Sequence, residues 1–406
     1  PVVLDITKSA QNEMVEFNYE PCTFIRSYLP YPEIKENQID EAAKLINGAK
    51  KPYALVGQGV ILANAEKELK DFLEKADIPA ASTLLGLSAM QTDFRLNKGF
   101  LGMHGNVAPN MKTNECDVLI AIGMRFDDRV TGDLNTYAKQ AKIIHLDIDP
   151  SEIDKNVQTT VPVWGDCKET LPALTALIQQ KTYPEWLQKF RDFEKKQIEA
   201  VINDELHPSS GELTMGEVIS RLNELTNGEA IIVTDVGQHQ MVACRYAKLN
   251  KTRSNVTSGG LGTMGFALPA AIGAKFGAPE RTVVAVIGDG GFQMTLQELG
   301  TIMQSNIDVK ILILNNRFLG MVRQWQELFN QHRYSFVDIE SPDFVALAAA
   351  YRIKAKSISE RGEISASLNE MLEHKGSFLL EVMVTKENNV FPMVPQGCSV
   401  SEIRLK

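Results

Sequence analysis

Short apolar segments alternate with longer amphipathic segments along most of the chain. Between about residues 50 and 150, this pattern predicts a helix near Ala65–Ala76 and several strands around it. The predicted strands are Tyr53–Val56, Ile78–Ala81, Val118–Ile122 and Lys142–Ile148. Alternating strands and helices of this kind indicate an α/β unit with a parallel sheet.

The same alternation begins again after residue 180. A polar stretch, Gln179–Pro184, precedes an amphipathic helix, and strands are expected beyond it at Ile231–Thr234, Thr282–Ile287, Val309–Leu314 and Phe378–Val384. These strands are almost continuously apolar, which is typical of parallel strands covered by helices on both faces. We therefore expect an α/β fold with two doubly wound parallel-sheet domains, at residues 36–180 and 181–406.

The first 35 residues fit neither of these domains. The β-branched, apolar segment Pro1–Thr7 predicts a strand, and the prolines among residues 19–37 predict a connector. No initiator methionine precedes the strand. We interpret residues 1–35 as a strand and a linker, with two origins left open: the remnant of a missing N-terminal domain, or an ordinary processed N-terminus with a first strand at a sheet edge.

Composition narrows the class of protein. The 406 residues are 44% hydrophobic and 23% charged, enough for two or three packed domains. A net charge of −9 argues against binding to nucleic acid or an anionic membrane, because such binding depends on clustered Lys and Arg. No stretch approaches the ~20 apolar residues that span a bilayer, and the five cysteines lack disulfide or zinc spacing. We expect a soluble protein of the cytoplasm.

A glycine-rich corner follows one of the predicted strands. Thr282–Ile287 leads into Gly288-Asp289-Gly290-Gly291, and a helix is expected to begin near Thr295. Glycines let the backbone approach an anion, a helix N-terminus offers N–H groups, and a carboxylate can hold a cation that bridges phosphates. On its own, this corner is better interpreted as a structural turn than as a diphosphate site, because strand-Gly-Asp-Gly turns are frequent in α/β proteins.

A second polar pair favours the diphosphate interpretation. Val309–Leu314 leads into Asn315-Asn316, and Asn316 lies 27 residues after Asp289, the length of one strand–helix–strand crossover. Both side chains should emerge at the carboxyl edge of adjacent parallel strands, where open α/β sheets bind ligands. Oxygen ligands with no His or Cys nearby favour Mg²⁺.

Gly-Asp-Gly followed by Asn-Asn at this interval resembles the thiamin-diphosphate motif of the 2-oxo acid decarboxylases and carboligases. Further segments resemble the large catalytic subunit of acetolactate (acetohydroxyacid) synthase, and the resemblance covers nearly the whole chain. These segments are Thr234–Gln240, Ser258–Gly265 and Gly320–Trp325. The resemblance implies decarboxylation of pyruvate and transfer of the two-carbon unit to a second 2-oxo acid, pyruvate or 2-oxobutanoate, in the biosynthesis of branched-chain amino acids.

The resemblance also implies roles for individual residues. Asp289 and Asn316 would bind Mg²⁺ through their side chains, and Phe318 through its carbonyl. Contacts to thiamin diphosphate would come from Gly237, Gln238, His239, Gly262, Met264, Asp289, Gly290, Gly291, Asn316 and Met321. Met264 would wedge the cofactor into a bent form, and Arg129 would lie near the entering substrate. Trp325 would contact the alkyl group of the second substrate, or else simply pack in the core.

A second cofactor is implied in the first domain. Gly57-Gln58-Gly59 is half of a dinucleotide motif, but the acidic residue expected ~20 positions onward is absent, which favours a structural turn over a nicotinamide site. Segments 102–105, 123–129 and 145–148 nevertheless resemble the FAD-binding domain of the same family. That resemblance implies FAD contacts from Gly57, Thr83, Leu84, His104, Gly105, Arg125, Asp147 and Asp166. His104 and His145 are equally well interpreted as core or backbone-paired histidines.

In this family, a glutamate from an N-terminal pyrimidine-binding domain activates a cofactor that binds between subunits. The sequence begins at what resembles the last strand of that domain, so we expect a half-site with little turnover by itself. The resemblance implies a homodimer or tetramer and allows a regulatory small subunit. Three alternatives remain: a pyruvate oxidase or decarboxylase of the same superfamily, a FAD-free acetolactate-forming enzyme, and a non-catalytic nucleotide-binding assembly protein.

Overall fold

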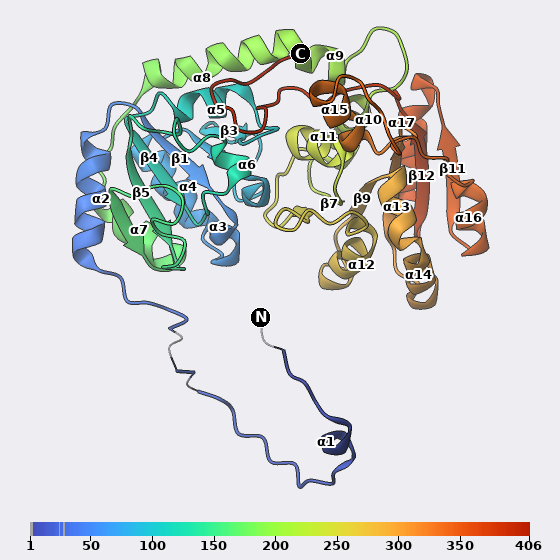
Figure 1. Cartoon of the computed structure of the whole chain (residues 1–406), viewed down its shortest axis with the longest axis horizontal. Helices are drawn as coiled ribbons and strands as arrows, with labels where there is room; N and C mark the ends of the chain where they lie inside the picture. The colour runs from blue at the N-terminus through green and yellow to red at the C-terminus, as the bar shows by residue number, and fades with distance from the viewer. Residues whose placement is uncertain (1–2, 24, 27–28) are drawn as a thin grey trace.

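A computed structural model describes residues 3–23, 25–26 and 29–406. Two six-stranded sheets lie side by side, each with helices on both faces (Figure 1). All strand pairs within the two sheets are parallel. The predicted α/β class with two doubly wound parallel sheets is therefore confirmed.

The first sheet has the strand order β3-β2-β1-β4-β5-β6. Its strands are β1 (Pro52–Val56), β2 (Ala80–Ser82), β3 (Asn97–Phe100), β4 (Val118–Ile122), β5 (Lys142–Asp147) and β6 (Val161–Trp164). The chain builds the sheet outward first on one side of β1 and then on the other, so β1 and β4 are the neighbours at which the winding direction reverses.

Helices cover both faces of the first sheet because successive strand residues point to opposite sides. Ala54 and Val56 of β1 pack in one core with α2 (Glu36–Gly48), α3 (Gln58–Leu62), α4 (Glu66–Ala76) and α7 (Cys167–Leu177). Tyr53 and Leu55 pack in a second core on the other face. The helices of that core are α5 (Val107–Thr113), α6 (Asp128–Thr131) and α8 (Pro184–Gln197).

The second sheet has the strand order β11-β12-β10-β9-β7-β8. Its strands are β7 (Ile231–Thr234), β8 (Asn255–Thr257), β9 (Val283–Gly288), β10 (Lys310–Asn315), β11 (Lys354–Ile358) and β12 (Phe378–Met383). Here the winding direction reverses between β7 and β9. The reversal matters for function, because ligands of open α/β sheets bind outside the carboxyl ends of the strands at such a point.

Two helical layers also cover the second sheet. One core contains α10 (Met215–Thr226), α11 (Gln238–Tyr246) and α17 (Ile364–Glu373). The core on the other face contains α12 (Ala267–Gly277), α13 (Asp289–Thr295), α14 (Leu299–Ser305) and α16 (Phe344–Ala350). The remaining elements are α1 (Lys8–Asn12), the 3-10 helices η1 (Leu84–Gly86), η3 (Leu296–Glu298) and η4 (Arg361–Glu363), the π-helix η2 (Ile198–Ile202), α9 (Asn203–Leu206) and α15 (Gly320–Phe329).

The helix predicted to open near Thr295 begins earlier, at Asp289, so that prediction is wrong by almost two turns. Gly288 is both the last residue of β9 and the extended residue that precedes the helix. No intervening turn separates strand from helix. Gly290 and Gly291 therefore belong to the first turn of α13 rather than to a loop.

The strand predicted at residues 1–7 is also wrong as far as the structure describes it; Pro1 and Val2 lie outside the described residues. Residues 3–7 form no strand, and Thr7 instead caps α1. Val3 and Leu4 are 91% and 80% exposed. A β-branched, apolar segment becomes a strand only where a neighbouring strand and a buried face receive it, and the described part of this chain offers these residues neither.

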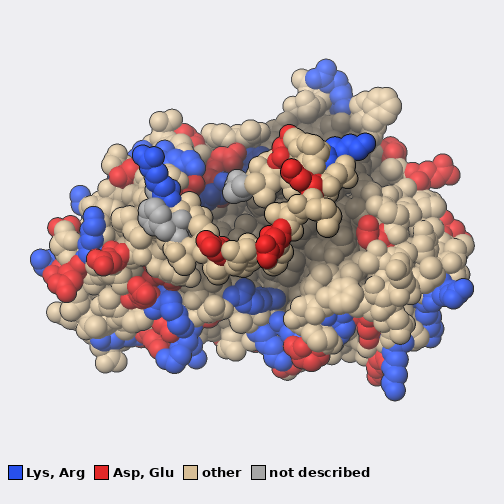
Figure 2. All heavy atoms as spheres, turned by 90° about the horizontal axis from the view of Figure 1, so that it is seen from below, with Lys and Arg blue, Asp and Glu red and all other residues tan. Residues whose placement is uncertain are grey.

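Side-chain and backbone contacts join the two units. Asn255 Nδ2 donates to the Leu84 carbonyl at 3.0 Å, and the C-terminal segment returns to the first unit, where Val394 N donates to the Met103 carbonyl at 2.7 Å. On the face seen in Figure 2, side chains of both charge signs are interspersed. In the described part of the chain, no helix combines the length and apolar character needed to cross a bilayer.

Candidate functional site

A cavity of about 40 Å³ lies at the carboxyl ends of β7, β9 and β10. It is lined mainly by the segments that follow these strands, together with Met264 after β8 and Met215 of α10, at the point where the second sheet reverses its winding direction. Nine of the ten residues that the resemblance assigned to thiamin diphosphate line it: Gly237, Gln238, His239, Met264, Asp289, Gly290, Gly291, Asn316 and Met321. Phe318 lines it as well. Gly262 does not line it; this residue lies in the exposed loop after β8.

Asp289 contributes a buried carboxyl group to this cavity. The residue is 1% exposed, and its Oδ2 accepts a hydrogen bond from Ser341 Oγ at 3.1 Å. Its Oδ1 is buried without a hydrogen-bond partner. Burial raises the pKa of this carboxyl to about 6. A buried oxygen without a partner is unfavourable unless something binds it, so Asp289 fits a cation ligand.

Asn316 reaches the same cavity from the neighbouring strand. Leu314 of β10 pairs with Gly288 of β9, so the residues that follow the two strands emerge side by side. Asn316 is buried, donates from Nδ2 to Gln238 Oε1 at 3.2 Å, and accepts from Phe318 N at its Oδ1, also at 3.2 Å. Within the described residues, no three His, Cys, Asp or Glu side chains form a metal cluster. A cation here would therefore be held by one carboxylate, by amide or carbonyl oxygens, and by the anionic molecule that binds together with it.

Glycines are required at this corner because neighbouring side chains leave no room for a Cβ atom. A Cβ on Gly291 would lie 1.9 Å from Asp235 Oδ2, and a Cβ on Gly320 would lie 2.2 Å from Gln238 Oε1. Asp235 is fully buried; it accepts from Gly265 N at 2.9 Å and contacts His239 Nε2 at 2.5 Å. Any side chain at Gly291 would therefore disturb the loop that carries Met264.

Sequence reasoning singled out neither Asp235 nor Ser341. Asp235 could have been found by the rule that identified Asp289 and Asn316, since it directly follows the apolar strand β7. Ser341 gives no such signal. It lies 52 residues after Asp289 in the sequence, and only the folded chain brings the two together.

Two residues with expected substrate roles lie away from this cavity. Trp325 is half-buried on α15, where its ring packs on Phe329 with centroids 4.8 Å apart. Arg129 belongs to the first unit; its side chain is 61% exposed and lines a separate cavity of about 220 Å³ beside the C-terminal segment. Neither residue lines the cavity around Asp289, and their substrate roles stay predictions.

The eight residues assigned to FAD share one edge of the first sheet. Gly57 follows β1, Thr83 and Leu84 follow β2, His104 and Gly105 follow β3, Arg125 follows β4, Asp147 ends β5, and Asp166 follows β6. Because the six strands are parallel, all eight positions lie at the carboxyl edge. This is the edge at which doubly wound sheets bind dinucleotides.

Several of these residues also have local structural partners. Gly57 precedes α3, and Gln58 and Gly59 are its first two residues. A Cβ on Gly57 would lie 2.2 Å from the Gly123 carbonyl, so this glycine allows the start of α3 to pack closely on the segment after β4. Thr83 caps η1 and Asp166 caps α7 through their side-chain oxygens. The Gly-Gln-Gly segment therefore has a structural role, as the start of a helix rather than as a turn, and contact with FAD stays a prediction.

The two histidines of the first unit are both buried. His145 Nε2 lies 2.9 Å from the Met124 carbonyl, which matches the interpretation of a backbone-paired core histidine. His104 Nδ1 has no partner. Burial, followed by the nearby Arg245 and Arg129, lowers the pKa of His104 to about 3, so its ring is neutral at pH 7.

Comparison with known proteins gives an independent result. Residues 235–382 match the family described as "Thiamine pyrophosphate enzyme, C-terminal TPP binding domain", and residues 39–174 match "Thiamine pyrophosphate enzyme, central domain". The first region contains every residue that the resemblance assigned to thiamin diphosphate.

Similar curated proteins are acetolactate synthase large subunits. The isozyme 2 large subunit of Escherichia coli is 40% identical over 405 residues, which cover 99% of this chain and 72% of that protein. A probable large subunit of Methanocaldococcus jannaschii is 41% identical over 412 residues, covering 99% and 69%. The isozyme 3 large subunit of Escherichia coli is 39% identical over 415 residues, covering 100% and 72%. With the Asp289–Asn316 cavity at the expected sheet edge, these similarities show that the chain belongs to the acetolactate synthase large-subunit family of thiamine pyrophosphate enzymes.

Proposed function

We propose that this chain binds the diphosphate end of thiamin diphosphate in an acetolactate synthase. The reaction would decarboxylate pyruvate and join the remaining two-carbon unit to a second 2-oxo acid, pyruvate or 2-oxobutanoate. When bound, the cofactor supplies an electron-accepting ring that takes up the electrons released as carbon dioxide leaves. The observation that carries the proposal is the meeting of Asp289 and Asn316 at one cavity beyond β9 and β10.

Within this proposal, Mg²⁺ would be held by Asp289, Asn316 and the Phe318 carbonyl. The unpartnered Oδ1 of Asp289 supports this role, because a buried oxygen of this kind fits a hard cation. The remaining ligands of the ion would come from the cofactor and from water. The diphosphate would lie against Gly290 and Gly291, where the close contacts of the corner exclude side chains.

Met264 would hold the cofactor in its bent form. Its Cε lies 3.9 Å from the position that a Cβ would take on Gly290, so the side chain extends over the glycine corner. A side chain in this position would restrict the conformation of a bound cofactor, and a restricted conformation favours reactions between groups that it holds close together.

The remaining assignments concern the substrates, the second cofactor and the assembly. Arg129 would meet the entering substrate, and Trp325 would meet the alkyl group of the acceptor, where one methylene changes binding by only ~1–3 kcal/mol. FAD would lie at the carboxyl edge of the first sheet. A homodimer or tetramer and a regulatory small subunit complete the proposal.

Cofactor titration tests the central assignment. We expect thiamin diphosphate to bind only in the presence of Mg²⁺ and the Asp289→Ala variant to lose this binding. Little turnover is expected of this chain by itself, so product analysis would use the chain joined to a pyrimidine-binding domain of the family; it then separates the reactions of the superfamily. Acetolactate supports the proposal, whereas acetaldehyde or acetyl phosphate as the main product would replace it with a decarboxylase or oxidase. Visible absorption of the purified protein tests for flavin.

A further inference from the structure

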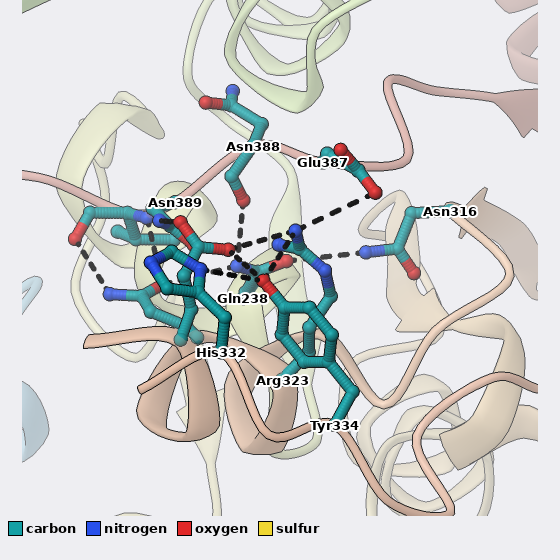
Figure 3. Close-up of polar contacts among 11 residues, drawn as sticks. Gln238, Asn316, Arg323, His332, Tyr334, Glu387, Asn388 and Asn389 are labelled. Atoms are coloured by element: carbon teal, nitrogen blue, oxygen red, sulfur yellow. Dashed lines mark hydrogen bonds and ion pairs between the residues drawn. The ribbon is translucent and has the colours of Figure 1, made fainter. Parts of the chain in front are cut away.

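Three amide side chains form a hydrogen-bonded series that ends at the cavity. Gln324 Oε1 accepts from Gln238 Nε2 at 3.1 Å, and Gln238 Oε1 accepts from Asn316 Nδ2 at 3.2 Å. All three side chains are buried. Figure 3 shows Gln238 between Asn388 and Asn316, with the Asn316 nitrogen directed toward Gln238 and its oxygen directed away.

Backbone groups fix the direction of this series at its far end. Val390 N donates to Gln324 Oε1 at 2.9 Å, and the Val390 carbonyl accepts from Gln324 Nε2 at 3.3 Å. A backbone N–H can only donate, and a carbonyl can only accept. The amide of Gln324 therefore has one satisfied orientation.

The same reasoning fixes the next amide. Gln238 Nε2 donates to the Asn388 carbonyl at 2.7 Å and to Gln324 Oε1. Both partners are acceptors, so the nitrogen of Gln238 must face them and its oxygen must face Asn316. Gly320 makes room for this contact, since a Cβ there would lie 2.2 Å from Gln238 Oε1 and 2.8 Å from Asn316 Nδ2.

Asn316 is oriented in turn. Its nitrogen faces the Gln238 oxygen, and its Oδ1 accepts from Phe318 N. A reversed amide would place two oxygens against each other and turn an NH₂ group toward the ion, and NH₂ is no ligand for Mg²⁺. Phe318 N favours the same orientation of Asn316 from the other side of the amide. We infer that Gln324 and Gln238 are positioning residues: their hydrogen bonds to the backbone of residues 388–390 orient the Gln238 oxygen toward Asn316 Nδ2, and so help to hold the Asn316 oxygen as the atom that faces the cation.

This inference rests on the proposed function, because it presumes a cation at Asp289 and Asn316. It assigns Gln238 a task besides any contact with the diphosphate. Metal affinity should therefore depend on Gln238 and Gln324 only while position 316 carries an amide. A carboxylate at position 316 has two equivalent oxygens and needs no orientation.

A double-mutant cycle tests this dependence, with Mn²⁺ as the metal probe. Binding of Mn²⁺ in the presence of saturating thiamin diphosphate would be followed by the electron paramagnetic resonance signal of free Mn²⁺. We expect Gln238→Met to weaken Mn²⁺ binding by about 10–100-fold, the usual effect of losing an outer-shell partner, and Gln324→Met by a smaller factor in the same direction. In an Asn316→Asp background, both losses should shrink to less than about threefold or become gains.

Gln326 provides a matched control on the same helix. It makes the same two kinds of backbone contact as Gln324, here with the N–H and carbonyl of Ser335. Gln324 also bonds Gln238, whereas the contacts of Gln326 lie outside the series that leads to Asn316. Gln326→Met should leave Mn²⁺ affinity unchanged. If Gln324→Met does not fold, as judged by circular dichroism, Gln324→Glu replaces it. That variant keeps an acceptor toward both Gln238 and Val390 N, and should lose less affinity than Gln238→Met.

Each outcome supports or overturns one of the two proposals. Equal losses in the unsubstituted and Asn316→Asp backgrounds would mean that Gln238 acts on the phosphate or the fold, and unchanged affinity in Gln238→Met would mean that it orients nothing. Either result overturns this inference while leaving the cofactor assignment intact. If the unsubstituted protein binds no Mn²⁺ with thiamin diphosphate, or Asp289→Ala binds as well as it does, the proposed function itself fails and this inference fails with it.

Discussion

At the scale of single residues, the two carboxyl oxygens of Asp289 lie in different surroundings. One oxygen has a partner in Ser341, and the other is buried with none. Burial raises the pKa of the carboxyl to about 6. A proton and a metal ion should therefore compete for the same group just below neutral pH.

We expect the affinity for Mg²⁺, at saturating thiamin diphosphate, to fall as the pH drops below about 6, by roughly tenfold per pH unit. The sign follows from the raised pKa, because the protonated carboxyl cannot bind the ion. Metal titrations between pH 5 and 7.5 would measure this slope. The Asp289→Asn variant should bind Mg²⁺ more weakly, and its affinity should change with pH only through protonation of the phosphates. If its affinity changes with pH as steeply as that of the unsubstituted protein, Asp289 does not bind the metal.

His104 gives a second prediction at this scale. Its folded-state pKa of about 3 lies below the ordinary value of 6.5, so below pH 6.5 the unfolded chain takes up a proton that the native ring refuses. This histidine should cost about 2 kcal/mol of stability at pH 5 relative to pH 7.5. Urea unfolding at both pH values should show that His104→Gln reduces this loss, whereas replacing the exposed His207 by Gln should not.

At the scale of elements, the apolar pattern identified the inner strands and missed the outer ones. Eight of the nine strands expected from the sequence, all but the one at residues 1–7, correspond to the four central strands of each sheet. The four that were missed are β3, β6, β8 and β11, and each is an edge strand. An edge strand has one neighbour and a less buried surface, so its composition carries a weaker signal; residues 354–357 of β11, for example, are exposed or half-buried.

Helix α13 carries a prediction about its glycines. Gly291→Ala would place a Cβ against Asp235, and we expect a loss of about 1–3 kcal/mol in unfolding free energy together with loss of thiamin-diphosphate binding. Gly273 in α12 is the matched control, because nothing lies within 4 Å of a Cβ there. Gly273→Ala should be neutral or stabilising by up to about 1 kcal/mol. Chemical denaturation of both variants would show whether the close approach matters.

At the scale of the whole molecule, Arg245 joins segments that are far apart in the sequence. It lies at the end of α11, whose first turn lines the cavity, and donates to the carbonyls of His104, Phe391 and Pro392. One guanidinium therefore links the second sheet, a loop of the first sheet and the C-terminal segment.

Removing this link should destabilise the contact between the units more than either unit itself. We expect Arg245→Met to lose about 1–3 kcal/mol, because three carbonyls lose a charged donor. Hydrogen exchange would locate the effect, with faster exchange expected around residues 102–106 and 391–394 and little change in the central strands. Uniformly faster exchange throughout the second sheet would contradict this assignment.

The sequence by itself determined the inner strands, the α/β class and the strand ends that carry Asp289 and Asn316, because apolar runs and the polar residues that follow them are local features. Tertiary structure alone decided that Ser341 meets Asp289, that residues 3–7 form no strand, and that Gln324 faces the backbone of residue 390. The contact between Gln324 and Val390, for example, joins residues 66 positions apart. Contacts of this kind depend on how the layers pack against one another, which no local pattern encodes.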